Sequence, residues 1–343
     1  DKVKVGTLIA EAGGFVSAPI YSSVSGTVFK VDTSIDATGY RKPCIIINVE
    51  GDEWEESIDR SDKLETLESH TELTPEEIVN RIKEAGVTGM GGAGFPTFIK
   101  LCPPPGAKAE CVIINGVECE PYITADYRLM MEHADEILVG LNLLMKAAKV
   151  EKGYIGIEDN KPAAIKLFEE KTANDARIEI VPLAKKYPQG GEKQLVDAVI
   201  RRQVPAPPAI PVNVGAIVQN VGTAFAVYQA VMKNKPLFER YTSVTGKQVK
   251  NPGNFLVRIG TPFSQMIENC GGLPEGDNKV LAGGPMMGKA VISLDVPVTK
   301  GTNSITVLTD ADAHRKKAQP CTRCAKCVDA CPTSLEPHLL ATS

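Results

Sequence analysis

The chain has 343 residues and a formal net charge of −4, with 43% hydrophobic and 23% charged residues. This length suggests two or three domains at roughly 150 residues each, and the apolar fraction is sufficient for a packed core, which excludes general disorder. The small negative charge and the aromatic content of 5% disfavour a nucleic-acid-binding protein. No apolar run reaches the ~18 residues of a membrane span, so we expect any membrane association to come through a partner.

Residues 1–55 predict a small all-β unit. Short apolar stretches separated by Gly, Pro and Ser are expected to form strands over residues 4–9, 15–18, 26–31 and 44–49. The segments 16–19 and 24–28 resemble the barrel-sandwich fold of lipoyl carriers. No lysine stands in the hairpin-tip setting of such a carrier, so we expect a structural platform rather than a swinging arm.

A polar, acidic stretch over residues 56–74 is expected to be a linker. Thr74, Pro75 and Glu77 then have the spacing of a capping box with proline at the first helical position, which predicts the start of a helix. Strands and helices alternate up to residue 235, which indicates an open parallel α/β sheet. Strands are expected over 112–115, 154–157 and 178–182, and helices over 125–148, from 162, over 191–202 and over 216–233.

Short strands and Gly/Pro turns return over residues 236–295, with a helix expected near 262–269, and predict a small α+β unit. Residues 296–343 are expected to be a linker followed by a cysteine segment. Both ends of the sequence suggest a fragment of a longer protein.

The cysteine segment has the spacing C-x2-C-x2-C-x3-C-P of bacterial ferredoxins, and consists of Cys321, Cys324, Cys327, Cys331 and Pro332. An odd total of nine cysteines, four of them crowded here, excludes a disulfide framework. Three thiolates two residues apart suit one face of an iron–sulfur cube, and the fourth ligates another cluster in two-cluster ferredoxins. A zinc site, which usually takes two separated pairs, and inert thiols stay open as alternatives.

Only one such run is present, so we expect incomplete clusters in this chain. Cys321, Cys324 and Cys327 would ligate one [4Fe–4S] cluster, and Cys331 a second. We therefore expect a low iron content, with about four irons per cluster restored in a longer chain.

A glycine loop over residues 89–94 fits G-x-G-x-x-G, but it follows a helix rather than a strand, which makes it a weak dinucleotide signal. A helix-like segment containing Lys100 comes next. Backbone N–H groups of such a loop, a helix N-terminus and a cation suit a phosphate or a flat ring.

Polar residues also follow the strand that ends at Asn115. Because ligands bind at the carboxyl ends of parallel strands, Asn115, Glu118 and Glu120 are candidate ligands, with an exposed turn as the alternative. Two further loops, at residues 187–192 and 218–223, carry glycine and polar residues in comparable positions.

Several of these motifs together resemble one family. Residues 89–100, 115–121, 187–195 and 218–223 resemble the FMN- and NADH-binding subunit of respiratory complex I. The closer resemblance is to the C subunit of the Rnf electron-transport complex, and is carried by residues 115–122, 156–162, 186–194, 283–288 and the ferredoxin run. A related Rnf-like protein of amino-acid reductase systems is the alternative.

The resemblance implies a multidomain α/β protein. Its parts would be a lipoyl-like barrel-sandwich domain (1–55), a linker (56–74), a Rossmann-like parallel α/β FMN/NADH domain (75–235), a β-grasp SLBB-type domain (236–295), and a linker with a truncated ferredoxin-like segment (296–343). The implied FMN-binding residues are Gly89, Gly91, Gly92, Ala93, Lys100, Asn115, Glu118, Gly190, Gly191, Val218, Gln219, Asn220 and Thr223. The implied NADH-binding residues are Phe95, Glu120, Tyr187 and Glu192.

The function that the resemblance implies is NADH oxidation in a membrane-bound, ion-translocating NADH:ferredoxin oxidoreductase. Hydride would pass to FMN and single electrons to [4Fe–4S] clusters, so no protein side chain is expected to be catalytic. The subunit would be peripheral on the cytoplasmic side of the cell membrane, with NAD(H) and other subunits, including a ferredoxin-like iron–sulfur subunit, as partners. A soluble NADH-linked electron donor to a cytoplasmic reductase, and a non-catalytic docking scaffold with a vestigial flavin site, are the alternatives.

Overall fold

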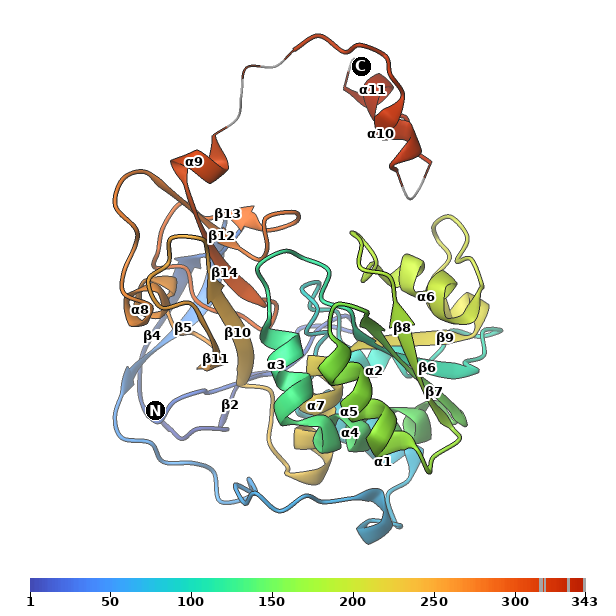
Figure 1. The fold of residues 1–343 in the computed structure, drawn as a ribbon. Coiled ribbons are helices and arrows are strands. Elements are labelled where there is room, and N and C mark those ends of the chain that lie inside the picture. Colours follow the sequence, from blue (N-terminus) through green and yellow to red (C-terminus); the bar gives the residue numbers. More distant parts are fainter. Residues whose placement is uncertain (315–316, 318, 332–333, 342–343) are drawn as a thin grey trace.

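The computed structural model describes residues 1–314, 317, 319–331 and 334–341, so Pro332 of the cysteine run lies outside the described residues. Figure 1 shows the chain passing from an N-terminal β region into a central α/β region and then into a second β region. Within the described residues, no helix has the length and apolar character needed to cross a lipid bilayer.

The N-terminal region contains two small antiparallel sheets. One has the order β1 (Lys2–Val3), β4 (Gly26–Ile35), β5 (Arg41–Val49), and the other pairs β2 (Leu8–Ala10) with β3 (Ile20–Tyr21). The strand expected over residues 15–18 is wrong, because this segment is the loop between β2 and β3, and Pro19 at its end has no N–H to pair. The strand expected over residues 4–9 is interrupted at Gly6, whose φ is +94°.

The linker contains η1 (Leu67–Ser69) and leads to α1 (Pro75–Glu84). The capping box is confirmed, since Thr74 Oγ1 accepts from the Glu77 N–H and the Glu77 carboxylate accepts from the Thr74 N–H at 2.7 Å. The glycine loop follows α1 and ends at the short helix α2 (Thr97–Lys100).

The central region is built on a four-stranded sheet in which every pair is parallel, as expected. Its order is β8 (Ile178–Leu183), β7 (Lys152–Glu158), β6 (Cys111–Gly116), β9 (Ala216–Asn220). Val112 and Ile114 belong to the larger core on one side of the sheet, whereas Ile113 belongs to a smaller core that includes residues of α6 (Glu192–Ile200). Strands buried on both faces explain the continuous apolar runs of the sequence.

Two helix predictions in this region are corrected. The helix expected over 125–148 divides at His133 into α3 (Ala125–Glu132) and α4 (Ala134–Ala148). The helix expected over 216–233 is wrong in its first turn, because residues 216–220 form β9 beside β6, and only the rest is α7 (Val221–Met232). Short apolar runs fit both periodicities, and here pairing in the sheet decides. The helix expected from Pro162 is present as α5 (Pro162–Thr172), and η2 (Pro211–Val214) precedes β9.

Close packing of α4 on α7 fixes the start of α7 at the edge of the sheet. The two helices touch at Gly140, where a Cβ atom would lie 2.0 Å from the Ala224 carbonyl oxygen. Asn220, the N-cap of α7, accepts a hydrogen bond from the Gly222 N–H at 2.8 Å. The N-terminus of α7 therefore opens directly after β9, at the carboxyl edge of the sheet.

The second β region has a mixed five-stranded sheet with the order β11 (Gly253–Arg258), β10 (Glu239–Thr245), β14 (Ser304–Thr309), β12 (Asn278–Ala282), β13 (Lys289–Ala290). The expected helix is present as α8 (Phe263–Asn269). We call these strands, α8 and the loops that join them the five-stranded unit. Residues 304–309, expected to be a linker, instead form the central strand, parallel to β10. α9 (Asp310–Ala313), α10 (Lys326–Asp329) and α11 (Pro337–Leu340) follow.

Candidate functional site

A cavity of about 530 Å³ lies where the glycine loop meets the carboxyl ends of β6 and β9. Its volume is within the range of small-molecule sites, and its position is the usual one for ligands of open α/β sheets. Most of the residues predicted to bind FMN line it, namely Gly89, Gly91, Ala93, Lys100, Asn115, Gly190, Val218, Gln219 and Asn220. Phe95 and Glu192, predicted to contact NADH, line it too.

The glycine loop presents bare backbone at this site. Gly92 and Gly94 have φ values of +118° and +67°, which favour glycine, and a Cβ atom on either would meet no atom of the described residues within 4 Å. The loop is bound to α7, because the buried Thr223 Oγ1 accepts a hydrogen bond from the Met90 N–H at 2.9 Å. Thr223 therefore supports the loop and does not line the cavity.

Two amide side chains show what the cavity offers a ligand. Asn115 Nδ2 donates to the Gly190 carbonyl at 2.9 Å, which joins the end of β6 to the loop before α6. Gln219 is 2% exposed, and its buried Nε2 finds no acceptor among the residues that the structure describes. A buried amide donor facing a cavity is costly unless a ligand accepts from it. Open glycine backbone, this donor and a nearby cation together fit a flavin mononucleotide.

Lys100 supplies the cation of the cavity. Its Nζ forms an ion pair with the Glu192 carboxylate and donates to the Val218 carbonyl at 3.1 Å. Glu192 is the first residue of α6, and Gly191, its N-cap, lies just outside the cavity lining. Because the two charges of the ion pair are opposite, the pair leaves the cavity nearly neutral.

Glu118 has a different position from the one that a cavity ligand needs. Its carboxylate accepts hydrogen bonds from the N–H groups of Asp126 (2.7 Å) and Tyr127 (3.2 Å), so it caps the start of α3. Burial, and then repulsion from the Asp126 carboxylate, raises the pKa of Glu118 to about 8. Its predicted role toward FMN therefore stays a prediction.

Of the predicted NADH residues, Phe95 and Glu192 line the cavity, whereas Glu120 and Tyr187 are not among its lining residues. Phe95 and Tyr187 are each 38% exposed, which suits aromatic surfaces open to a ligand. The Glu120 carboxylate accepts hydrogen bonds from the N–H groups of Met286 (3.0 Å) and Met287 (2.8 Å), in the turn between β12 and β13. The turn between β12 and β13 thus contacts the segment that follows β6.

An apolar wall of the cavity was not predicted from the sequence. It consists of Pro103 and Pro104 after α2 and of residues 210–212 at η2. A flat ring needs apolar surfaces beside it, and rigid proline loops provide them with little entropy loss. Two such stretches, each next to a predicted ligand segment, were the available signal.

The second candidate site is the cysteine run, of which the structure describes all four cysteines. Cys321, Cys324 and Cys327 are exposed, and Cys331 is half-buried. Among the described residues, no three metal-binding side chains come together in a group that could hold an ion.

Comparison with known proteins connects this site to named families. The family model described as "Nuo51 FMN-binding domain" matches residues 82–229, the one described as "SLBB domain" matches residues 241–290, and the one described as "RnfC Barrel sandwich hybrid domain" matches residues 1–52. These matches and the observed sheets confirm the expected fold class of a barrel-sandwich region, a parallel α/β region and an SLBB-type region.

Relatives match over nearly the whole chain. The C subunit of a proton-translocating ferredoxin:NAD(+) oxidoreductase complex of Clostridium ljungdahlii is 44% identical, over 99% of this chain and 73% of that protein. The C subunit of a Na(+)-translocating ferredoxin:NAD(+) oxidoreductase complex of Acetobacterium woodii is 43% identical, over 99% of this chain and 76% of that protein. Among solved structures, an NAD+-reducing [NiFe]-hydrogenase in its H2-reduced state has a TM-score of 0.56 at 22% identity, over 69% of this chain and 47% of that one, a likeness of fold alone.

Proposed function

The chain belongs to the family of C subunits of ion-translocating ferredoxin:NAD(+) oxidoreductase complexes, and from this premise we propose that it is the flavin-containing, NADH-oxidising subunit of such a complex. The observation that carries the proposal is the glycine-lined cavity with its buried Gln219 amide, inside the segment that matches an FMN-binding domain. Among the described residues, this amide lacks an acceptor that a flavin would supply.

We assign the binding of FMN to the residues predicted above. The backbone of the glycine loop (89–94) would lie against the face of the cofactor, and Lys100 would neutralise the phosphate of FMN. The proposed FMN-contacting residues are Gly89, Gly91, Gly92, Ala93, Lys100, Asn115, Gly190, Gly191, Val218, Gln219 and Asn220. Glu118 and Thr223 would act on the site indirectly, because Glu118 caps α3 and Thr223 accepts from the Met90 N–H. When bound, FMN supplies hydride acceptance and the release of electrons one at a time.

The residues of the chain would position NADH rather than react with it. Phe95 and Tyr187 are partly exposed and would offer aromatic faces, and the carboxylates of Glu120 and Glu192 would accept hydrogen bonds from ribose or amide groups. The proline walls would exclude water from the flavin ring. Positioning and desolvation are the protein's part in hydride transfer.

The iron–sulfur assignment rests on the spacing of Cys321, Cys324, Cys327 and Cys331. The described thiols do not converge on one metal position, so we derive no step through them. We propose these four thiols as ligands of [4Fe–4S] clusters. We also propose that the domain limits are those expected from the sequence. Iron and sulfide analysis of the chain with and without a partner iron–sulfur subunit tests this, and iron-free protein in both cases would overturn it.

The place of the protein in the cell is proposed from the family. The names of its relatives, each a subunit of a complex, support other subunits as partners. We propose in addition a peripheral position on the cytoplasmic side of the membrane. Fractionation of cells that contain the whole complex tests this. Recovery in the cytosol, without other subunits, would instead support the soluble electron donor.

Flavin binding and NADH oxidation are tested on the purified chain. We expect apoprotein to quench the fluorescence of added FMN with a saturable one-to-one stoichiometry, and NADH to bleach the bound flavin and support ferricyanide reduction. Protein that binds neither FMN nor NADH would overturn the proposal and favour the docking scaffold. FAD and NADPH, added in parallel, are the controls for specificity.

A further inference from the structure

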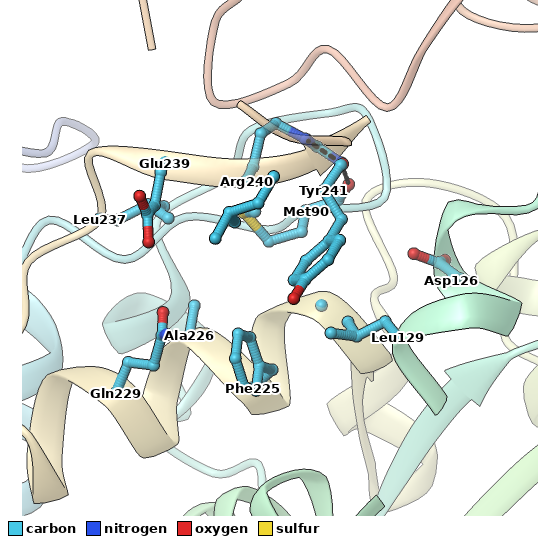
Figure 2. Close-up of a pocket in the computed structure, with 12 residues that line it drawn as sticks. Met90, Asp126, Leu129, Phe225, Ala226, Gln229, Leu237, Glu239, Arg240 and Tyr241 are labelled. Carbon is cyan, nitrogen blue, oxygen red and sulfur yellow. Dashed lines mark hydrogen bonds between the residues drawn. The ribbon is translucent and has the colours of Figure 1, made fainter. Parts of the chain in front are cut away.

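A buried arginine of the five-stranded unit contacts the glycine loop. Arg240, in β10, is 3% exposed, and its guanidinium donates to three backbone carbonyls, those of Tyr241 (3.1 Å), Met90 (3.2 Å) and Lys300. Figure 2 shows Arg240 beside Met90, across a small cavity from Phe225 of α7 and Leu129 of α3. Met90 stands between the first two glycines of the loop, 150 residues away in sequence.

The contact fixes the loop from the side opposite to α7. Thr223 Oγ1 accepts from the Met90 N–H, and Arg240 donates to the Met90 carbonyl, so both backbone groups of Met90 have partners in different regions. A loop rich in glycine has many accessible conformations, and each such bond removes part of that freedom. The pair of bonds therefore selects one conformation of the residues that precede Gly91 and Gly92.

A second contact reaches the middle of the same loop, at Gly92. Gly301 lies so close to it that a Cβ atom there would be 3.0 Å from the Gly92 carbonyl oxygen. The turn that contains Gly301 is anchored by its neighbour Lys300, whose Nζ donates to the carbonyls of Pro19 (2.8 Å) and Gly86 (2.7 Å). The five-stranded unit thus touches the loop at Met90 and at Gly92.

Other roles for this arginine fit the geometry less well. The cavity beside it measures about 20 Å³, the space of roughly one water molecule, which is too small for an organic ligand. The Asp126 carboxylate, which also lines it, accepts a hydrogen bond from Asn220 Nδ2 at 2.7 Å. Burying a guanidinium is costly, and here its hydrogen bonds within the described residues all go to backbone carbonyls.

We propose that Arg240 is a positioning residue of the flavin site, which holds the glycine loop in its ligand-binding conformation through the Met90 carbonyl, and that Gly301 holds the same loop at Gly92. The five-stranded unit is then part of the flavin site and not a separate attachment. This inference rests on the proposed binding of FMN.

The test compares Arg240→Lys and Gly301→Ala with the unsubstituted chain. Lysine keeps the charge but lacks the planar fork that reaches several carbonyls at once, and the alanine methyl pushes on Gly92 from outside. We expect each change to raise the Kd for FMN about tenfold, which is about 1.4 kcal/mol, and to alter the visible circular dichroism of the bound flavin. Arg258→Lys is the control, because Arg258 is in the same unit but pairs with Asp52.

Thermal unfolding of the apoproteins separates positioning from folding. Variants that keep the melting temperature of the unsubstituted apoprotein, but lose FMN affinity, support the inference. If Arg240→Lys fails to fold, the Gly301→Ala variant provides the test. Variants whose FMN affinity and visible dichroism equal those of the unsubstituted chain would overturn the inference. If the unsubstituted chain itself binds no FMN, the proposed function fails, and this inference fails with it.

Discussion

Replacing Lys100 by Met is the most direct test of how the cavity handles a phosphate. Lys100 and Glu192 form an ion pair inside the cavity, with side chains 29% and 40% exposed. The Lys100→Met change leaves Glu192 as an unpaired charge of −1, Glu192→Gln leaves +1, and the double variant returns to zero. An anionic cofactor should therefore bind the three variants in a fixed order of affinity.

The magnitude follows from Coulomb's law with screening. Two unit charges about 4 Å apart interact by about 4 kcal/mol at an effective dielectric constant of about 20. Because both side chains are about one-third exposed, water and salt reduce this, and we take about 2 kcal/mol. The Lys100→Met variant should then bind FMN about 30-fold more weakly, Glu192→Gln more tightly, and the double variant close to the unsubstituted chain.

The assay is a fluorescence titration of apoprotein with FMN, without NADH, at two salt concentrations. Lys193→Met is the matched control. It also removes one positive charge, but from the residue that follows Glu192 in α6, where Lys193 Nζ donates to the Pro205 carbonyl. The reasoning is refuted if Lys100→Met binds FMN as the unsubstituted chain does. It is refuted equally if Lys193→Met has the same effect, since the loss would then be one of general charge.

Two further predictions concern stability. Gly140→Ala should lower the free energy of unfolding by about 3 kcal/mol, because the alanine methyl group meets the Ala224 carbonyl of α7. Gly13→Ala, whose methyl group would have no described atom within 4 Å, should change it by less than about 0.5 kcal/mol. Urea unfolding measures both, and equal effects would contradict the packing argument. The pKa of Glu118 is raised from 4.5 to about 8 in the folded protein, so its contribution to stability falls as pH rises from about 4.5 to 8, by at most about 1.4 kcal/mol per pH unit. Glu118→Gln should flatten that decline, and an unchanged pH profile of unfolding would show that Glu118 ionises normally.

Local sequence signals predicted the parts of the fold that local interactions determine. The capping box at Thr74 requires three neighbouring residues, and it forms as expected. Residues 216–220 could not be assigned in this way, because a five-residue apolar run before a helix fits a first turn as well as a strand. Its partner, β6, is about a hundred residues earlier, and only the sheet shows that the run completes it. The same holds for β14, whose pairing with β10 spans some sixty residues.

The candidate site divides along the same line. Glycines and polar residues that follow strands were found from the sequence, and most of them line the cavity. Glu118 was assigned to the cavity from its place after β6, but its backbone has φ of +49° and its carboxylate caps α3. Arg240 carries no local motif at all. Its importance arises from three carbonyls that come together only in the folded chain.

The position of the glycine loop explains why a second unit is needed beside it. In a usual dinucleotide fold such a loop leaves a strand and enters a helix, and both elements hold it. Here it follows α1 and ends at α2, a helix of four residues, and its two ends are joined by hydrogen bonds from the Gly89 N–H to the Phe95 carbonyl (2.8 Å) and from the Thr97 N–H to the Val87 carbonyl (3.1 Å). Inside the loop the structure adds further contacts, because Thr223 accepts from the Met90 N–H, Arg240 donates to the Met90 carbonyl and Gly301 approaches Gly92 closely. We therefore expect a chain whose five-stranded unit no longer contacts Met90 and Gly92 to bind FMN more weakly.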